Sequence, residues 1–128
     1  MDTNNAKLRL KVIPLLSRTG KPVTNQYVIT DSQGNTYFQS YKTIIAVVSP
    51  SLDKSSSRRF QTILDRYYWD YSATTSRYRN KFLNETTAET RAKIKSGEYT
   101  LASLNDSWLG SLDILYPVLS RHLAVETF

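Results

Sequence analysis

The sequence predicts an α+β domain, in which an antiparallel sheet of four or five strands from the N-terminal half packs against two or three helices from the C-terminal half. Two patterns predict it. Apolar residues alternate with polar ones in the first half, which is the period of a half-buried strand, and after Asp70 they recur every three or four residues, as on a helix. A length of 128 residues suits a single domain over residues 1–128.

The first strand is expected from Lys7 to Val12, where cations alternate strictly with aliphatic residues. Leu8, Leu10 and Val12 are expected to face the core, and Pro14 limits the strand to a sheet edge or ends it. Glycine-containing turns at 17–22 and 31–35 then separate strands expected at 23–30, 36–41 and 44–48. Residues 59–64 are either a fifth strand or the start of a helix, and their alternation favours a strand.

Two helices are predicted between residues 70 and 97. The buried face of the first helix is expected to contain the side chains of Tyr71, Thr75, Tyr78 and Phe82, which follow one another at steps of four, three and four. Asp70 or Ser72 is expected to cap this helix. The second helix is expected from Thr87 to about Ser96, because Glu89 lies near its start, lysines lie near its end and Gly97 can stop it. Tyr99 and Leu101 are expected to return to the core.

Three other segments are expected: a flexible arm at 1–6, a mobile serine-rich loop at 49–58 and a leucine-rich helical tail at 103–124. Apolar residues of the tail follow one another at steps of three and four from Leu101 to Leu123, and Pro117 should kink the helix. The apolar face of this tail would pack on the sheet of its own domain or, alternatively, form a homodimer through Leu112, Leu115 and Leu119.

The composition argues against catalysis. There is no cysteine, the only histidine is His122, and the four glycines are too far apart for a phosphate loop. No serine lies in a nucleophile elbow, and Asp65 and Asp70 are badly spaced to share a metal. We therefore expect a protein that is not an enzyme, with no metal and no cofactor. No aliphatic run approaches the roughly 20 residues that cross a bilayer, so an intracellular protein without a membrane partner is expected.

Positive charge is concentrated in the first two-thirds of the chain. The formal net charge is +6, and residues 54–83 alone carry seven Lys/Arg against two acids. Such asymmetry is typical of a face that binds a polyanion, although a solvated surface with an uneven distribution of charge would show the same counts.

Cations and aromatic rings are interleaved between residues 66 and 82. Rings that stack on unpaired bases, beside cations that contact phosphates, are what a single-strand binder needs. The same rings could instead be core residues, and Trp, Tyr and Arg are also the preferred anchors of protein interfaces. The residues expected to bind nucleic acid or a protein partner are Lys7, Arg9, Lys11, Arg58, Arg59, Arg66, Trp69, Arg77, Arg79 and Lys81.

A string of short segments adds a resemblance over roughly residues 20–105. The segments are YFQSY (37–41), IIA (44–46), LD (64–65), YWDYS (68–72), TT (74–75), YRN (78–80), FL (82–83), KIKSGEY (93–99) and LN (104–105). The string resembles a group of small uncharacterised proteins of bacteriophages and mobile elements. The resemblance implies a phage-type accessory protein acting in the cytoplasm of a bacterial host, and it assigns no functional residue. The serine-rich loop and the leucine-rich tail depart from that pattern.

Two functions from different classes follow as expectations. The first is a non-enzymatic accessory protein that binds nucleic acid, single-stranded or without sequence preference, through a basic and aromatic surface. The alternative is an accessory factor that captures or inhibits a host protein or defence complex, with a host or phage protein as its partner. A structural component of the virion is a third expectation.

Overall fold

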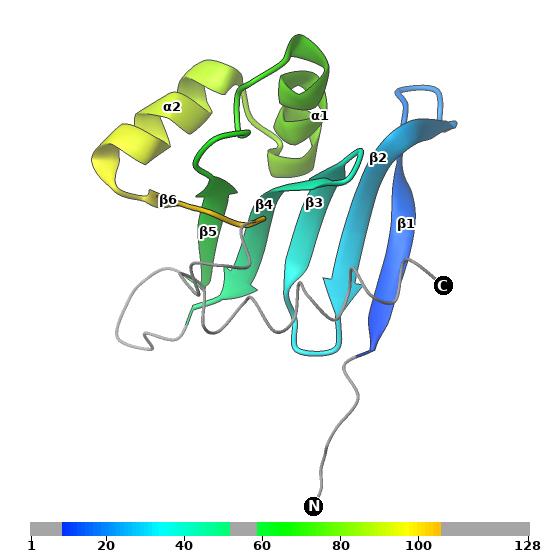
Figure 1. The fold of residues 1–128 in the computed structure, drawn as a ribbon, viewed down its shortest axis with the longest axis horizontal. Helices are drawn as coiled ribbons and strands as arrows, with labels where there is room; N and C mark the ends of the chain where they lie inside the picture. Colours follow the sequence, from blue (N-terminus) through cyan, green and yellow to red (C-terminus); the bar gives the residue numbers. More distant parts are fainter. Residues whose placement is uncertain (1–8, 52–58, 106–128) are drawn as a thin grey trace, which may run out of the picture.

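A computed structural model describes residues 9–51 and 59–105 of the chain (Figure 1). One six-stranded sheet has its strands in chain order, and two helices follow the fifth strand. The strands are β1 (Leu10–Leu16), β2 (Pro22–Asp31), β3 (Thr36–Ser40), β4 (Thr43–Pro50), β5 (Phe60–Asp65) and β6 (Tyr99–Ala102). The helices are α1 (Ala73–Leu83) and α2 (Thr87–Ser96). The predicted α+β class is confirmed.

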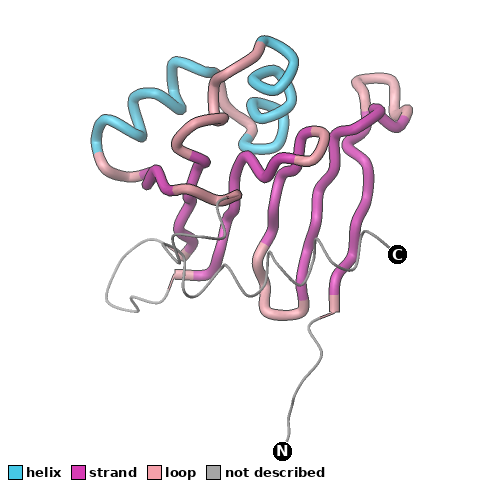
Figure 2. Tube along the Cα trace, viewed as in Figure 1, coloured by secondary structure: helices cyan, strands magenta, loops and turns pink. Residues whose placement is uncertain are grey.

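The sheet differs from the prediction in one strand. β1 to β5 form an antiparallel meander, but β6 pairs with β5 in parallel, with Thr62 opposite Tyr99 and Leu64 opposite Leu101. A parallel pair needs a crossover connection, and the two helices between β5 and β6 supply it (Figure 2). The sheet is therefore mixed and has six strands, rather than antiparallel with four or five.

The two helices begin and end at local capping signals. Ser72 accepts a hydrogen bond from the Thr75 amide and starts α1. Thr86 and Glu89 form a reciprocal capping box at the start of α2, and Gly97, in the left-handed region at φ 86°, ends it. The predicted bounds of α2, from Thr87 to Ser96, are confirmed.

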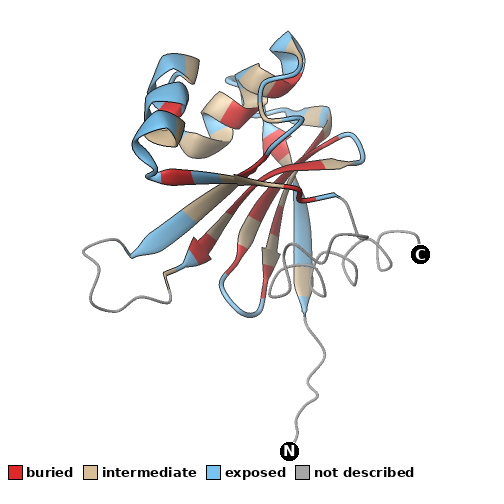
Figure 3. Cartoon of the chain, turned by 60° about the vertical axis from the view of Figure 1, so that its left-hand side comes forward, coloured by how far each residue is buried: buried red, intermediate tan, exposed pale blue. Residues whose placement is uncertain are grey.

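Apolar side chains gather on both faces of the sheet. Both helices lie on one face of the sheet, and the apolar cluster between them and the sheet is called the helix-side core. It contains Phe38, whose ring stacks on that of Phe82 with 5.6 Å between the ring centres. Its other buried members are Leu15, Ile45, Ala46, Leu64 and Tyr99. The opposite face carries the far-side core, formed by Ile29, Tyr37, Ile44, Val47 and Leu104, with Leu10 and Ile63 packed against it. Figure 3 shows buried residues along the central strands and exposed ones on β1.

The β2–β3 turn is held by one buried carboxylate. Asp31 accepts hydrogen bonds from the amides of Gln33 and Asn35, the Asn35 side chain and the Tyr37 hydroxyl. Burial and the neighbouring Asp31 charge raise the pKa of Tyr37 far above its usual value. Gly34 has a φ of 90°, and a Cβ there would lie 3.2 Å from Pro50, so glycine is required.

The first strand departs most from its prediction. β1 begins at Leu10 and continues past Pro14, which pairs with Tyr27 at the sheet edge. Val12, predicted to face the core, is 40% exposed, because an edge strand is covered less completely than a central one. Lys7, Leu8 and the predicted arm at 1–6 lie outside the described residues.

Two other segments are partly described. Ser49 and Pro50, expected in a mobile loop, belong to β4, and the rest of that loop, including Arg58, lies outside the described residues except Ser51. Residues 103–105, expected in the leucine-rich helical tail, are not helical, and Leu101 is in β6. The rest of the predicted tail lies outside the described residues. Leu112, Leu115 and Leu119 lie outside the described residues.

Candidate functional site

Three tyrosines project from the short segment between β5 and α1. Tyr67, Tyr68 and Tyr71 are 62%, 40% and 57% exposed, and we call them the tyrosine cluster. The Tyr68 ring meets Tyr71 edge-on at 5.3 Å and Tyr67 at 6.5 Å, so the three rings form one aromatic surface. Tyr71 was predicted on the buried face of a helix, but α1 begins only at Ala73, which leaves Tyr71 outside it.

A buried carboxylate at the end of β5 fixes this segment. Asp65 Oδ2 accepts hydrogen bonds from the Tyr67 and Tyr68 amides, at 3.0 and 2.9 Å. Its Oδ1 accepts from the Leu104 amide at 2.8 Å and from Asn105 Nδ2 at 3.0 Å. The backbone that carries the tyrosines is therefore tied to the chain beyond β6.

Trp69 lies between two arginines rather than on the open surface. The guanidinium carbon of Arg79 is 5.0 Å from the centre of a Trp69 ring, and that of Arg91 is 5.6 Å away. Trp69 also packs against the helix-side core and is only partly exposed. Its role is therefore largely structural, and the tyrosines beside it form the accessible aromatic surface.

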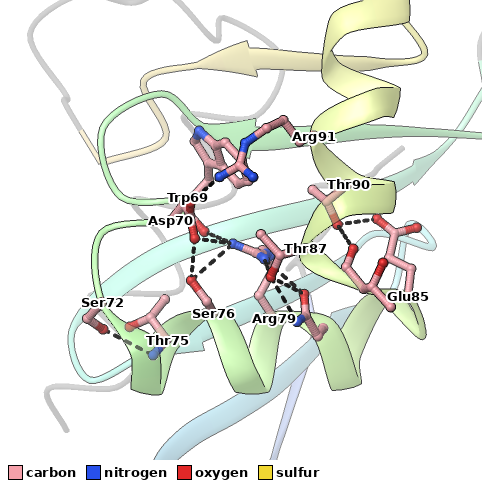
Figure 4. A network of polar contacts seen from close by, with 12 residues as sticks. Trp69, Asp70, Ser72, Thr75, Ser76, Arg79, Glu85, Thr87, Thr90 and Arg91 are labelled. Carbon is pink, nitrogen blue, oxygen red and sulfur yellow. Dashed lines mark hydrogen bonds and ion pairs between the residues drawn. The ribbon is translucent and has the colours of Figure 1, made fainter.

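Arg79 is a structural residue, which corrects its prediction as a binding residue. Its side chain is 0% exposed. Nη1 donates to the carbonyl of Trp69 and to Ser76, and Nη2 donates to Asn80 and Thr87 at 2.8 and 2.9 Å (Figure 4). The guanidinium thus joins the tyrosine-bearing segment to α1 and α2.

Asp70 forms ion pairs with both arginines beside Trp69. Its carboxylate lies 3.5 Å from Arg79 and 2.8 Å from Arg91, and it accepts a hydrogen bond from Ser76 at 2.6 Å (Figure 4). Burial alone would raise the pKa of Asp70, but the Ser76 hydrogen bond and the two arginines outweigh it, so the pKa lies below its usual value.

A second acid, Glu85, lies just before α2 and joins that helix to β6. Glu85 accepts hydrogen bonds from Thr90, Lys93 and Tyr99, at 2.5, 2.7 and 2.9 Å. Burial opposes the charged form of Glu85, but these hydrogen bonds outweigh it and lower the pKa. The Glu85 hydrogen bond raises the pKa of Lys93 to about 12, and burial with Glu85 raises that of Tyr99 to about 12.

Glu85→Gln is expected to lower the free energy of unfolding by about 2 kcal/mol at pH 7, since hydrogen bonds to a charged group are lost. Because the folded-state pKa is depressed, the stabilisation is complete above the ordinary value of 4.5 and disappears as the pH falls through the folded-state pKa. Urea unfolding should therefore show a gap between wild type and variant that shrinks in acid. Glu89→Gln, which keeps the capping box, is the control. An equal gap at pH 3 and pH 7 would contradict this explanation.

The predicted cations do not converge on one patch. Arg9 and Lys11 lie at β1, whereas Arg59 and Arg66 flank the two ends of β5. β1 and β5 are separated by three strands, so about 19 Å of sheet lies between them at roughly 4.8 Å per strand. Arg77 and Lys81 are exposed on α1, and Lys81 Nζ donates to the carbonyl of Leu16. Of the predicted set, Arg66 is the exposed cation in the segment that carries the tyrosine cluster.

Among the acids of the described ranges, four are buried or paired, whereas Glu89 and Glu98 are exposed. Asp31 and Asp65 are buried and hydrogen-bonded, and Asp70 and Glu85 are in ion pairs. Within the described ranges, this leaves many exposed cations without an ion-pair partner: Arg9, Lys11, Arg18, Lys21, Lys42, Arg59, Arg66, Arg77, Lys81 and Lys95. The described part of the surface therefore carries many positive charges that no neighbouring acid offsets.

In the part of the chain that the structure describes, no group of three or more His, Cys, Asp or Glu side chains is arranged to hold a metal ion. Nor is any helix there long and apolar enough to span a bilayer.

A mixed sheet with two helices on one face and an outward tyrosine cluster defines an α+β domain with an exposed aromatic surface. The chain belongs to the family of unknown function DUF8033, whose model matches residues 10–98. The match covers β1 to α2 and ends just before β6, so it includes the tyrosine cluster and Arg79. No curated protein and no solved structure is significantly similar to the chain.

Proposed function

We propose that this protein is a non-enzymatic, phage-type accessory protein of the bacterial cytoplasm that binds single-stranded nucleic acid. The observation that carries the proposal is the tyrosine cluster, fixed in place beside the exposed Arg66. Unpaired bases stack on exposed aromatic rings, and a neighbouring guanidinium can neutralise a phosphate. The resemblance to proteins of phages and mobile elements supports the bacterial setting.

The charge distribution supports the same function. Acids that are buried or paired cannot repel a phosphate backbone effectively, whereas the unpaired exposed cations attract one. Because these cations are spread over the sheet edge, the helices and the turns, they favour binding without sequence preference. Base contacts would then be made by the tyrosine cluster through stacking, which tolerates every base.

The rigidity of the segment favours binding as well. Four N–H groups hold Asp65, so the backbone of Tyr67 and Tyr68 is ordered before a ligand arrives. A surface that is organised in advance loses less conformational entropy on binding.

Tyr71→Ala is expected to weaken binding of a fluorescein-labelled oligo(dT) by about 1–3 kcal/mol, or roughly 5- to 150-fold in Kd, because one stacking ring is removed. Fluorescence anisotropy titrations measure the change. Phe60→Ala is the matched control, since Phe60 has the same exposed fraction of 57% but lies at the other end of β5. Equal losses in the two variants would contradict a role for the tyrosine cluster.

A series of titrations at increasing salt concentration tests the electrostatic contribution to nucleic-acid binding. Log Kd should rise linearly with log salt, and Arg66→Ala should reduce the slope by about 0.7 if Arg66 contacts one phosphate of a single strand. The same oligonucleotide annealed to its complement should bind more weakly, since its bases are already stacked. Absence of binding at low salt, or binding that ignores salt, would overturn the proposal.

Capture of a host or phage protein is the second candidate. The favouring observation is the edge-on packing of Tyr68 against Tyr71, which gives a large ordered aromatic area next to an arginine, as at the centre of many protein interfaces. Pull-down from nuclease-treated host lysate distinguishes the two functions. A prey that survives nuclease and disappears with Tyr71→Ala supports protein capture, whereas a prey that nuclease removes supports nucleic-acid binding.

A further inference from the structure

The far-side core is a buried apolar face that the described elements leave without a covering layer. Ile29, Tyr37, Ile44 and Val47 are buried there. Within residues 9–51 and 59–105, both helices contribute their packed apolar side chains to the helix-side core, on the opposite face of the sheet. A two-sided apolar sheet is stable in water only when each face is covered. Another part of the chain, or another molecule, must therefore lie on this face.

The chain reaches this face at the last residues that the structure describes. Leu104 is buried in the far-side core, directly after β6. Asn105 then pairs with the backbone of Ile44: Nδ2 donates to the Ile44 carbonyl at 2.9 Å, and Oδ1 accepts from the Ile44 amide at 2.7 Å. Asn105, the last residue that the structure describes, is therefore attached to β4 at the rim of this face.

The sequence after Asn105 has the pattern and length of a helix that could pack on the far-side core. At 100° per residue, one arc of about 80° contains Trp108, Leu112, Leu115, Leu119 and Leu123, while Arg121 falls on the opposite side and Asp113 and Ser120 fall outside the arc. Residues 106–124 as a helix would extend about 28 Å at 1.5 Å per residue. The sheet from β1 to β5 is about 19 Å wide at roughly 4.8 Å between strands, so one pass is long enough.

We propose that residues 106–124 form an amphipathic helix that packs across the far-side core of the same molecule. The leucines that could form a homodimer seam, Leu112, Leu115 and Leu119, are then used within the chain, and the protein is a monomer. Pro117 allows the helix to bend as it follows the twisted sheet. The tyrosine cluster, anchored through Asp65 to Leu104 and Asn105, is thereby connected to the position of the tail.

Cross-linking in the full-length chain tests this packing directly. The protein has no cysteine, so any introduced pair is unique. Ile63→Cys places a thiol in the far-side core, and it is combined in turn with Leu112→Cys, Leu115→Cys and Leu119→Cys. A short bismaleimide should convert most of at least one pair into a cross-linked product of monomer mass. Arg77→Cys, exposed on α1, with the same tail cysteines is the control and should give under a tenth of that yield.

Every outcome of this experiment decides the proposal. Monomeric product from Ile63 but not from Arg77 supports it. Products of dimer mass only would assign the tail to a second copy, and equal yields from both anchors, or no product from any pair, would leave the tail undocked; each result overturns the proposal.

A second pair of variants checks the same packing without cross-links. Leu115→Asp should raise the fluorescence of a hydrophobic dye several-fold, because it displaces the tail from the far-side core. Arg121→Asp, on the side of the same segment opposite that arc, should leave the fluorescence unchanged. Circular dichroism of Leu115→Asp establishes that the sheet is still folded, and equal dye signals from the two variants would contradict the docked helix.

Discussion

Arg79→Ala is expected to lower the free energy of unfolding by about 3–5 kcal/mol, which is the range for removing one partner of a buried charged network. The substitution leaves Asn80 and Thr87 without their guanidinium donor, and Asp70 with one arginine fewer. It also removes the cation that covers one face of Trp69. Urea denaturation followed by tryptophan fluorescence measures the loss.

Arg77→Ala is the control for this measurement, because Arg77 is an exposed cation on the same helix. Its change should stay within about 0.5 kcal/mol. Arg79→Lys should fall between the two, since a single ammonium cannot replace a planar group that donates in several directions. Equal stability of the Arg77 and Arg79 variants would refute the structural role of Arg79.

Asp65→Asn is expected to cost about 2–6 kcal/mol of stability. An NH2 group replaces one of the two carboxylate oxygens, so two N–H donors in a buried site lose their acceptor, at roughly 1–3 kcal/mol each. On one side these donors are the Tyr67 and Tyr68 amides, and on the other they are Leu104 and Asn105. The side chain keeps its size, so the loss reports hydrogen bonding rather than packing. Thermal and urea unfolding measure it.

Glu98→Gln is the control for Asp65, since Glu98 is an exposed acid and should change stability by less than about 0.5 kcal/mol. Under conditions where Asp65→Asn is still folded, its affinity for oligo(dT) should also fall, because the tyrosine segment is no longer fixed. A fully stable Asp65→Asn protein would show that the four donors are satisfied in another way.

Local signals in the sequence predicted local structure well. The bounds of α2 were predictable because Thr86, Glu89 and Gly97 act on backbone groups within a few residues. The turn at Gly34 was predictable for the same reason. β6 was not predicted as a strand, because four residues are too few to establish an alternating pattern. Its pairing also depends on β5, which is distant in the sequence.

The candidate site was only partly predictable. The segment Arg66–Tyr71 was identified from its composition, but which rings face solvent depends on where α1 begins, and Ser72 rather than Asp70 is its cap. Arg79 was misassigned because a charged residue is usually exposed. One signal could have shown its burial: Arg79 follows Thr75 by four residues, so it shares the face that was predicted to be buried.

The order of the strands has a consequence for how the chain acquires its structure. β1 to β5 each pair with the strand just made, through short turns or one loop, so most of the sheet needs only contacts between near neighbours in the chain. Such nearest-neighbour topologies favour rapid folding. β6 is different, because it must find β5 across residues 66–98. We expect its docking, which adds the Leu104 and Asn105 hydrogen bonds to Asp65, to follow the pairing of β1 to β5, so the segment of the tyrosine cluster is fully fixed only after those five strands have paired.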